Sequence, residues 1–118
     1  MILAVLDDLM FTSKIKTTGS QLGVTVAFAR SADAALSAMR NETPALVILD
    51  LNNPRTTPLA IVAEMRKDPA LAGIPTVGYV SHVQTDVIDA ARRAGVGEVL
   101  ARSAFTQRLA DILSVGHT

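Results

Sequence analysis

The 118-residue chain contains no cysteine and no tryptophan, and only 3% of its residues are aromatic. Without cysteine it has no disulfide bonds, no thiolate nucleophiles and no zinc sites with cysteine ligands. So few aromatic side chains cannot form a surface on which nucleic acid bases stack. Eleven Lys and Arg residues balance eleven Asp and Glu residues, so the chain also lacks the excess positive charge that attracts nucleic acid or an anionic membrane. We therefore expect neither nucleic acid nor a membrane as a partner.

Long hydrophobic runs are absent as well. None approaches the ~18 to 20 apolar residues that cross a bilayer. The first run, residues 2–6, is followed at once by two aspartates and is too short for a secretory signal, so we expect a cytoplasmic protein. Hydrophobic residues nevertheless make up 49% of the chain, a composition typical of a folded protein. A chain of this length forms one core, and we predict a single domain over residues 1–118.

Five short apolar runs, rich in β-branched residues and bounded by turn residues, predict five β-strands. They cover residues 2–6, 24–29, 45–49, 76–80 and 96–101. Most positions within them are apolar, as in parallel strands covered on both faces. The segments between the runs have helical spacing of their apolar residues. This alternation predicts an α/β fold, a doubly wound (βα)5 flavodoxin-like three-layer sandwich with a five-stranded parallel sheet.

Capping residues mark the expected ends of several helices. The predicted N-caps of the second, third and fourth helices are Ser31, Thr57 followed by Pro58, and Thr85 or Asp86. Gly95 is expected to end the fourth helix because glycine readily adopts the left-handed conformation found there. The last helix is predicted to begin near Ser103, and residues 115–118 are expected to be loose.

Three aspartates follow predicted strands: Asp7 and Asp8 follow the first, and Asp50 follows the third. These strands are commonly neighbours in a doubly wound sheet, whose functional sites lie at the carboxyl ends of the strands. Crowded carboxylates repel, so replacing Asp8 or Asp50 by asparagine is expected to stabilise the metal-free protein. Oxygen ligands favour Mg²⁺, and an aspartate beside Mg²⁺ can accept a phosphoryl group. The spacing alone leaves a metal site and three structural aspartates, used in caps and turns, about equally open.

Residues 4–8 (AVLDD), 46–54 (LVILDLNNP) and 95–102 (GVGEVLAR) resemble the receiver domain of two-component response regulators. The resemblance covers essentially the whole chain, and the acidic pair and the D-L-x-x-P segment match the family in order and separation. It implies that Asp50 is the phosphoacceptor and that Asp8 is a direct ligand of Mg²⁺. It further implies that Asp7 holds Mg²⁺ through water and that Asn52 offers its backbone carbonyl.

Other positions depart from the family. Arg102 stands where the family has a phosphate-binding lysine; it keeps the charge and can donate two hydrogen bonds to a phosphate. Val80 occupies the position of the switch serine or threonine, and the candidate switch hydroxyl, that of Ser81, comes one residue later. This offset matters because successive strand side chains face opposite sides of a sheet. Val99 replaces the aromatic switch residue found in many receivers. The chain therefore resembles an atypical, pseudo-receiver-like member with weakened switching.

The resemblance implies a stand-alone receiver domain that is not an enzyme. Its expected partners are a histidine kinase or phosphotransfer protein and a downstream protein, and we expect a monomer or a weak homodimer. The alternative is a phosphorylation-independent pseudo-receiver that acts purely as an interaction module. A flavodoxin-like or phosphatase-like enzyme is disfavoured, because residues 50–52 lack the second carboxylate of aspartate-based phosphatases and no flavin phosphate loop follows the first strand. His82, on the loop after the fourth strand, is interpreted as a solvated or turn-forming residue.

Overall fold

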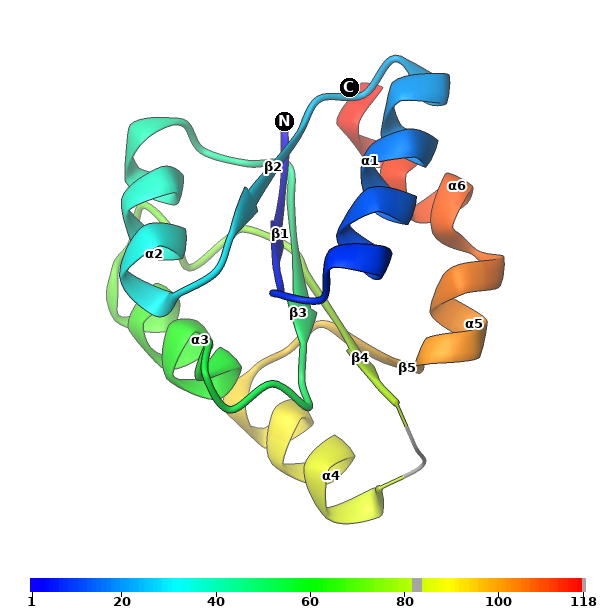
Figure 1. Cartoon of the computed structure of the whole chain (residues 1–118). Helices are drawn as coiled ribbons and strands as arrows, with labels where there is room; N and C mark the ends of the chain where they lie inside the picture. The colour runs from blue at the N-terminus through cyan, green and yellow to red at the C-terminus, as the bar shows by residue number, and fades with distance from the viewer. Residues whose placement is uncertain (82–83, 118) are drawn as a thin grey trace.

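The computed structural model describes residues 1–81 and 84–117 and contains a five-stranded sheet in the order β2-β1-β3-β4-β5 (Figure 1). The strands are β1 (Ile2–Val5), β2 (Val26–Ala29), β3 (Leu46–Asp50), β4 (Thr76–Val80) and β5 (Glu98–Ala101). All neighbouring strands run parallel. The winding reverses between β1 and β3, which confirms the predicted doubly wound α/β fold.

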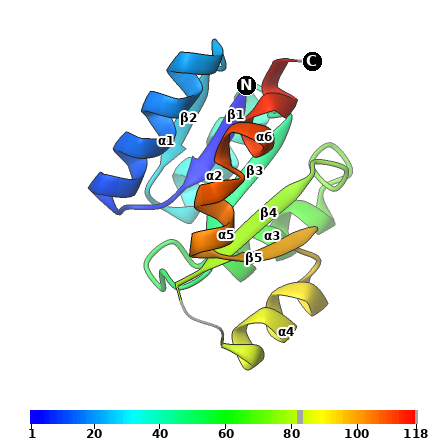
Figure 2. The ribbon, with the colours of Figure 1, turned by 90° about the vertical axis from the view of Figure 1, so that its right-hand side faces the viewer.

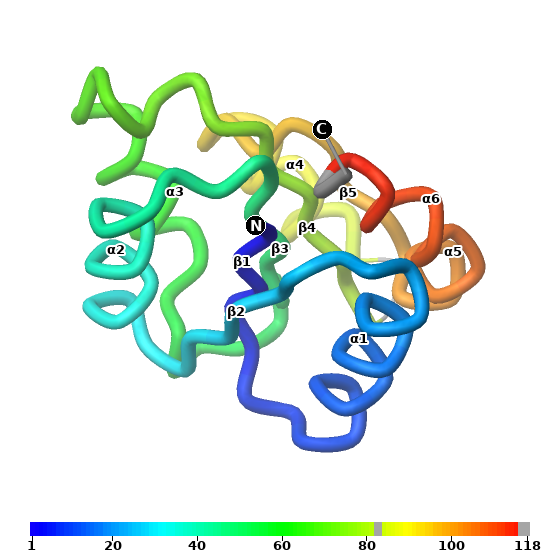
Figure 3. Tube along the Cα trace, turned by 90° about the horizontal axis from the view of Figure 1, so that it is seen from above, coloured from blue at the N-terminus to red at the C-terminus, as the bar shows by residue number. Residues whose placement is uncertain are grey.

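Helices cover both faces of the sheet, and the view from above separates the layers (Figure 3). One face carries α2 (Ala32–Asn41), α3 (Pro58–Lys67) and α4 (Thr85–Ala94). The other carries α1 (Leu9–Leu22), α5 (Arg102–Gln107) and α6 (Leu109–Leu113), the last two of which face the viewer in Figure 2. None of the described helices has the length and apolar character needed to span a membrane.

The core consists of two apolar clusters, one on each face of the sheet. Leu49 and Val80 belong to the cluster under α2, α3 and α4, whereas Ile48 and Tyr79 belong to the cluster under α1, α5 and α6. Adjacent residues of one strand thus enter different clusters, as the pleat requires. Both faces of the central strands are buried, which is why their sequences read as continuous apolar runs.

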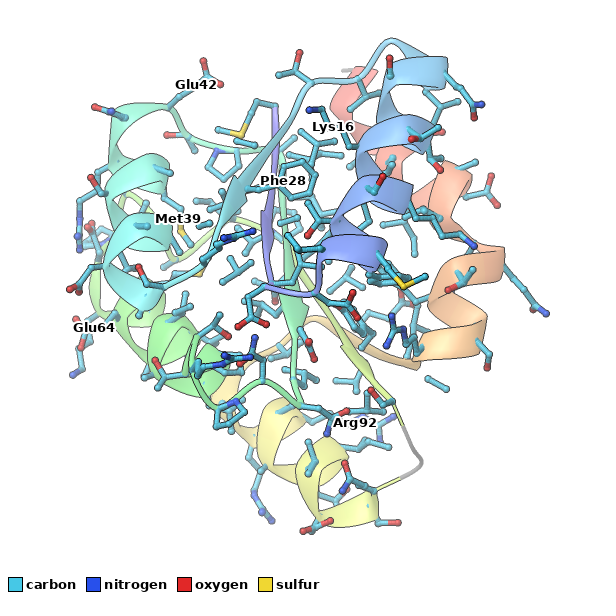
Figure 4. All side chains as sticks on the ribbon, in the orientation of Figure 1. Lys16, Phe28, Met39, Glu42, Glu64 and Arg92 are labelled. Carbon is cyan, nitrogen blue, oxygen red and sulfur yellow. The ribbon has the colours of Figure 1, made fainter. Side chains whose placement is uncertain are left out.

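The helices present one apolar side to these clusters. Met39 lies on the side of α2 that faces the sheet and is fully buried, whereas the exposed Glu42 and Glu64 point outward (Figure 4). A buried stripe beside a polar face is the pattern that stabilises a helix on a sheet. Tertiary burial therefore explains why these moderately short helices form.

Two predicted helix starts had different outcomes. Ser31 caps α2 as predicted, and its hydroxyl accepts a hydrogen bond from the Ala34 amide at 3.1 Å. The prediction that the Thr57 side chain caps α3 was wrong, because this hydroxyl makes no capping hydrogen bond to any described residue. Thr57 has a left-handed backbone with φ of 44°, instead of the extended conformation in which an N-cap side chain reaches the first turn. Pro58 still begins the helix, at a position where the missing amide costs nothing.

The prediction for the start of α4 was wrong, and the prediction for its end is confirmed. Its N-cap is Gln84, not Thr85 or Asp86, and the Gln84 side chain makes no capping bond within the described part of the chain. The side-chain amide of Gln84 is engaged with another loop instead, as described below. Gly95 ends the helix as predicted, with φ of 110°.

The segment predicted as one last helix forms two helices, α5 and α6. It begins at Arg102 and breaks at Arg108, whose φ of −97° and ψ of 8° separate α5 from α6. The apolar stripe is nevertheless buried as predicted, at Phe105, Leu109, Ile112 and Leu113. The tail was expected to be loose, but Ser114–His117 forms a 3₁₀ turn.

Candidate functional site

The carboxyl ends of the central strands and the loops that follow them surround a polar cavity of about 380 Å³. The six residues named as candidate site residues from the sequence all line it. Three further residues, which the sequence analysis missed, complete the wall. The nine residues are Asp7, Asp8, Asp50, Asn52, Asn53, Pro54, Arg55, Ser81 and Arg102. The parallel register therefore brings residues from distant parts of the chain to one edge of the sheet.

Asp8 lies between β1 and α1, and both of its carboxylate oxygens have partners. Oδ1 accepts a hydrogen bond from the Phe11 amide at 3.1 Å, so Asp8 is the N-cap of α1. Oδ2 lies 3.1 Å from Nη2 of Arg102. The Phe11 amide and, after it, the Arg102 guanidinium lower the pKa of Asp8 against an opposing effect of burial. These contacts reverse the expectation, drawn from crowding, that Asp8→Asn stabilises the protein.

Asp7 is held by two residues of the loop after β3. Its Oδ1 accepts a hydrogen bond from Nδ2 of Asn53 at 2.6 Å, and its Oδ2 pairs with Nη2 of Arg55 at 3.0 Å. Asn53 is buried, whereas 79% of the Arg55 side chain is exposed, so water screens this ion pair. The sequence did carry a signal for both residues: an amide and a cation follow Asp50 closely at the same edge of the sheet.

Asp50, the last residue of β3, has a different environment. Its Oδ1 accepts a hydrogen bond from the Asn52 amide at 3.0 Å, and it forms no ion pair with the residues that the structure describes. Burial raises the pKa of Asp50, and the charges of Asp7 and Asp8 add to the rise, against the Asn52 amide and Arg102. The surroundings of Asp50 therefore disfavour its charged form, whereas those of Asp8 favour it.

Tyr79 is the neighbour of Asp50 on β4, and both side chains face α1 and α5, because Ile48 and Tyr79 share one cluster. The ring packs against Phe11 and Phe105, with centroid separations of 5.0 and 4.9 Å. The buried hydroxyl has no hydrogen-bond partner among residues 1–81 and 84–117. Burial, followed by the negative charge of Asp50, raises the pKa of Tyr79. A buried hydroxyl without a described partner thus lies beside Asp50.

Arg102 reaches the cavity from the first turn of α5. Its Nη2 binds Asp8, and its Cζ lies 4.3 Å from the centre of the Phe11 ring. A guanidinium over an aromatic face gains a cation–π interaction, which favours one orientation of the side chain. The cation at the lysine position of the family is therefore directed toward Asp8 in this structure.

Ser81, and not Val80, brings a hydroxyl-bearing side chain to the cavity. Val80 is fully buried in the cluster under α2, α3 and α4, as is expected one residue away along a strand. Ser81 is exposed, lines the cavity and donates its backbone N–H to Oδ1 of Asn52. Val99, half-buried, packs against the same cluster as Val80. His82 lies outside the described residues.

The donor types of the cavity fit a hard divalent cation, because carboxylates and a backbone carbonyl are the ligands that Mg²⁺ takes from proteins. Within the described part of the chain, however, no three His, Cys, Asp or Glu side chains are grouped so that they could hold a metal ion. Asp7 and Asp8 hold Arg55 and Arg102 instead. A cation that enters the cavity would therefore compete with two guanidinium groups.

The sequence model of the family described as response regulator receiver domain matches residues 2–114. The structure of a response regulator from Hahella chejuensis is similar, with a TM-score of 0.87 and 22% identity, covering 99% of this chain and 94% of that chain. The receiver domain of NtrX from Brucella abortus has a TM-score of 0.80 and 24% identity, covering 100% and 99%. The Mn²⁺-bound form of response regulator Rcp1 has a TM-score of 0.78 and 21% identity, covering 96% and 91%. No curated protein matches the chain significantly.

Proposed function

The chain belongs to the response regulator receiver domain family, and we propose that it accepts a phosphoryl group on Asp50 and signals by binding another protein. The observation that carries the proposal is the contrast inside the cavity: Asp7 and Asp8 each bind a guanidinium, whereas Asp50 forms no ion pair within the described chain. A carboxylate left without a cation beside a cavity is suited to receive a ligand. In this proposal the domain is cytoplasmic, acts as a monomer or weak homodimer, and turns over no separate substrate.

The proposed donor is the phosphohistidine of a histidine kinase or phosphotransfer protein. An oxygen of Asp50 attacks phosphorus, the P–N bond breaks and an O–P bond forms. The electron pair of the broken bond stays on the histidine nitrogen, which takes up a proton. Arg102 lies on the same cavity and can stabilise the charge that spreads over the phosphoryl oxygens during transfer.

Asp7, Asp8, Asp50 and the backbone carbonyl of Asn52 are the groups that would hold a divalent cation. When bound, Mg²⁺ would neutralise charge on the phosphoryl oxygens and the acceptor. The chain's own contribution is to keep the three carboxylates on one cavity and to hold Asp50 half-buried at the end of β3. The Asn52 amide orients Oδ1 of Asp50 at 3.0 Å.

The alternative is a pseudo-receiver that acts purely as an interaction module, without phosphorylation. The observation in its favour is that Arg55 and Arg102 already neutralise Asp7 and Asp8. Because these guanidinium groups already neutralise the two carboxylates, a metal ion is not required for that purpose. The two functions differ in whether Asp50 becomes phosphorylated at all.

Intact mass spectrometry after treatment with acetyl phosphate and Mg²⁺ tests the proposal. We expect the wild type to gain one phosphoryl group, and to gain none when Mg²⁺ is chelated. Asp50→Asn should not gain it, whereas Asp111→Asn, an exposed aspartate of α6, should behave as the wild type does. A folded wild type that gains no phosphoryl group would favour the pseudo-receiver. A gain that persists in Asp50→Asn would assign the acceptor to another residue.

A further inference from the structure

Asn52 makes three hydrogen bonds that join separate parts of the site. Its backbone amide donates to Oδ1 of Asp50 at 3.0 Å. Its side-chain Oδ1 accepts from the Ser81 amide at 2.5 Å, and its Nδ2 donates to Oε1 of Gln84 at 2.6 Å. One residue therefore contacts the acceptor carboxylate, the residue after β4 and the N-cap residue of α4.

The two side-chain contacts bridge long stretches of sequence, 29 and 32 residues. The carboxamide of Asn52 supplies both an acceptor and a donor within one short side chain, and both are used here. The Gln84 carbonyl accepts the first helical hydrogen bond of α4, from Ile88 at 3.0 Å, so its side-chain contact bears directly on the start of that helix.

Asn52 and Gln84 also line a second, more apolar cavity of about 510 Å³, next to the site. Leu59 from α3 and Val87 from α4 lie on its wall. A change in the contact between Asn52 and Gln84 therefore alters the surface between α3 and α4, outside the acidic cavity.

We propose that the side-chain amide of Asn52 is a positioning group, which holds Ser81 at the cavity and couples Asp50 to the first turn of α4. The proposal rests on the proposed function in taking Asp50 as the responding carboxylate. It assigns to the side chain of Asn52 a task separate from the metal-binding carbonyl that the family resemblance implies. It also provides a connection to α4 in a chain whose Val80 and Val99 lack the hydroxyl and the aromatic ring of other receivers.

The test uses backbone NMR of the whole chain without a phosphodonor, so its result does not depend on whether Asp50 becomes phosphorylated. The perturbation is Asp50→Asn, introduced into the wild type and into Asn52→Ala and Gln84→Ala backgrounds. Asn52→Ala keeps the backbone amide that contacts Asp50 and removes only the side-chain amide. Asn53→Ala is the matched control, because that neighbouring side chain binds Asp7 and the Arg55 amide and, within the described part of the chain, has no hydrogen bond to Ser81 or Gln84.

In the wild type and in Asn53→Ala, we expect Asp50→Asn to shift the amides of Ser81 and of residues 85–88. In Gln84→Ala only the Ser81 shift should persist, and in Asn52→Ala both should be lost. Asn52→Asp should restore them, because a carboxylate accepts from the Ser81 amide and from a rotated Gln84 amide. Shifts in α4 that persist in Asn52→Ala, or that are absent in the wild type, would overturn the proposal. Failure of Asp50 to accept phosphate would instead overturn only the proposed function.

Discussion

Asp8 and Asp50 line the same cavity, but their surroundings shift their pKa values in opposite directions. Both oxygens of Asp8 have partners, and these lower the pKa of Asp8. Asp50 accepts the Asn52 amide, forms no ion pair within the described chain, and has a pKa that burial raises. The β1 side of the cavity thus stabilises the fold, whereas the β3 side holds a charge at a cost in stability. Such a cost is expected where a carboxylate is kept for chemistry.

The residues around each aspartate extend this contrast. On the β1 side, Arg102 binds Asp8 and also packs on the Phe11 ring. On the β3 side, the buried Tyr79 hydroxyl has no partner among the described residues. The β1 side of the cavity thus pairs its carboxylates with cations, whereas the β3 side holds Asp50 without an ion pair among the described residues and lies beside the unpartnered Tyr79 hydroxyl. Substitutions on the two sides should therefore change stability with opposite signs.

The largest effect is expected at Asp8. Asp8→Ala removes an N-cap and an ion pair and should lower the free energy of unfolding by about 2 kcal/mol. Asp8→Asn removes the charge but keeps a good N-cap, and should cost only about 0.5 kcal/mol. Urea denaturation of both variants measures the difference. An Asp8→Ala variant as stable as the wild type would mean that crowding of the carboxylates outweighs both contacts.

The sequence predicted the strands and the polar residues at their ends, but not the contacts between residues that are distant in the chain. The strands were predictable because burial on both faces demands apolar residues at nearly every position, and their carboxyl ends determine which polar residues meet. The ion pair between Asp8 and Arg102 could not be predicted in this way. Arg102 lies 94 residues from Asp8, and only the folded chain places them together. The bond between Asn52 and Gln84 likewise joins residues 32 apart, which no local pattern encodes.

Tyr79 offers the second largest effect, with the opposite sign. Tyr79→Phe removes a buried hydroxyl without a described partner and keeps the ring contacts with Phe11 and Phe105. We expect the free energy of unfolding to rise by about 1 kcal/mol, which urea denaturation can measure. Tyr79→Leu is the control that loses the ring packing and should be destabilising. A lower midpoint for Tyr79→Phe would reveal a hydrogen bond that stabilises the β3 side.

The affinity for Mg²⁺ tests whether the guanidinium groups of Arg102 and Arg55 compete with a metal ion for the carboxylates of Asp8 and Asp7. Arg102→Ala removes the guanidinium that binds Asp8, and we expect Mg²⁺ to bind about fivefold more tightly, equivalent to about 1 kcal/mol. Arg102→Lys keeps the charge and should stay closer to the wild type. Arg55→Ala should change the affinity less, because 79% of the Arg55 side chain is exposed to solvent. Isothermal titration calorimetry measures these affinities, and weaker binding in Arg102→Ala would contradict the competition.

The smallest effects concern pH, and they have opposite directions at the two aspartates. The pKa of Asp50 is raised above its ordinary value of 3.8, so the folded state binds more protons than the unfolded state just above that value. Wild-type stability therefore gains from Asp50 as the pH falls from neutral toward 3.8. Asp50→Asn, which should be more stable than the wild type at neutral pH, loses this advantage over the same range.

Asp8 should show the reverse. Its pKa lies below the ordinary value of 3.8, so its contribution to stability is fully present above that value and is lost as the pH falls through the lowered pKa. The deficit of Asp8→Asn relative to the wild type should therefore stay constant between neutral pH and about pH 5 and shrink only in stronger acid. Urea midpoints of the wild type and both asparagine variants, measured at the same ionic strength across this range, give the two slopes. If the curves for Asp8→Asn and Asp50→Asn ran parallel, the two sides of the cavity would be electrostatically alike, and the distinction between a structural and a reactive carboxylate would fail.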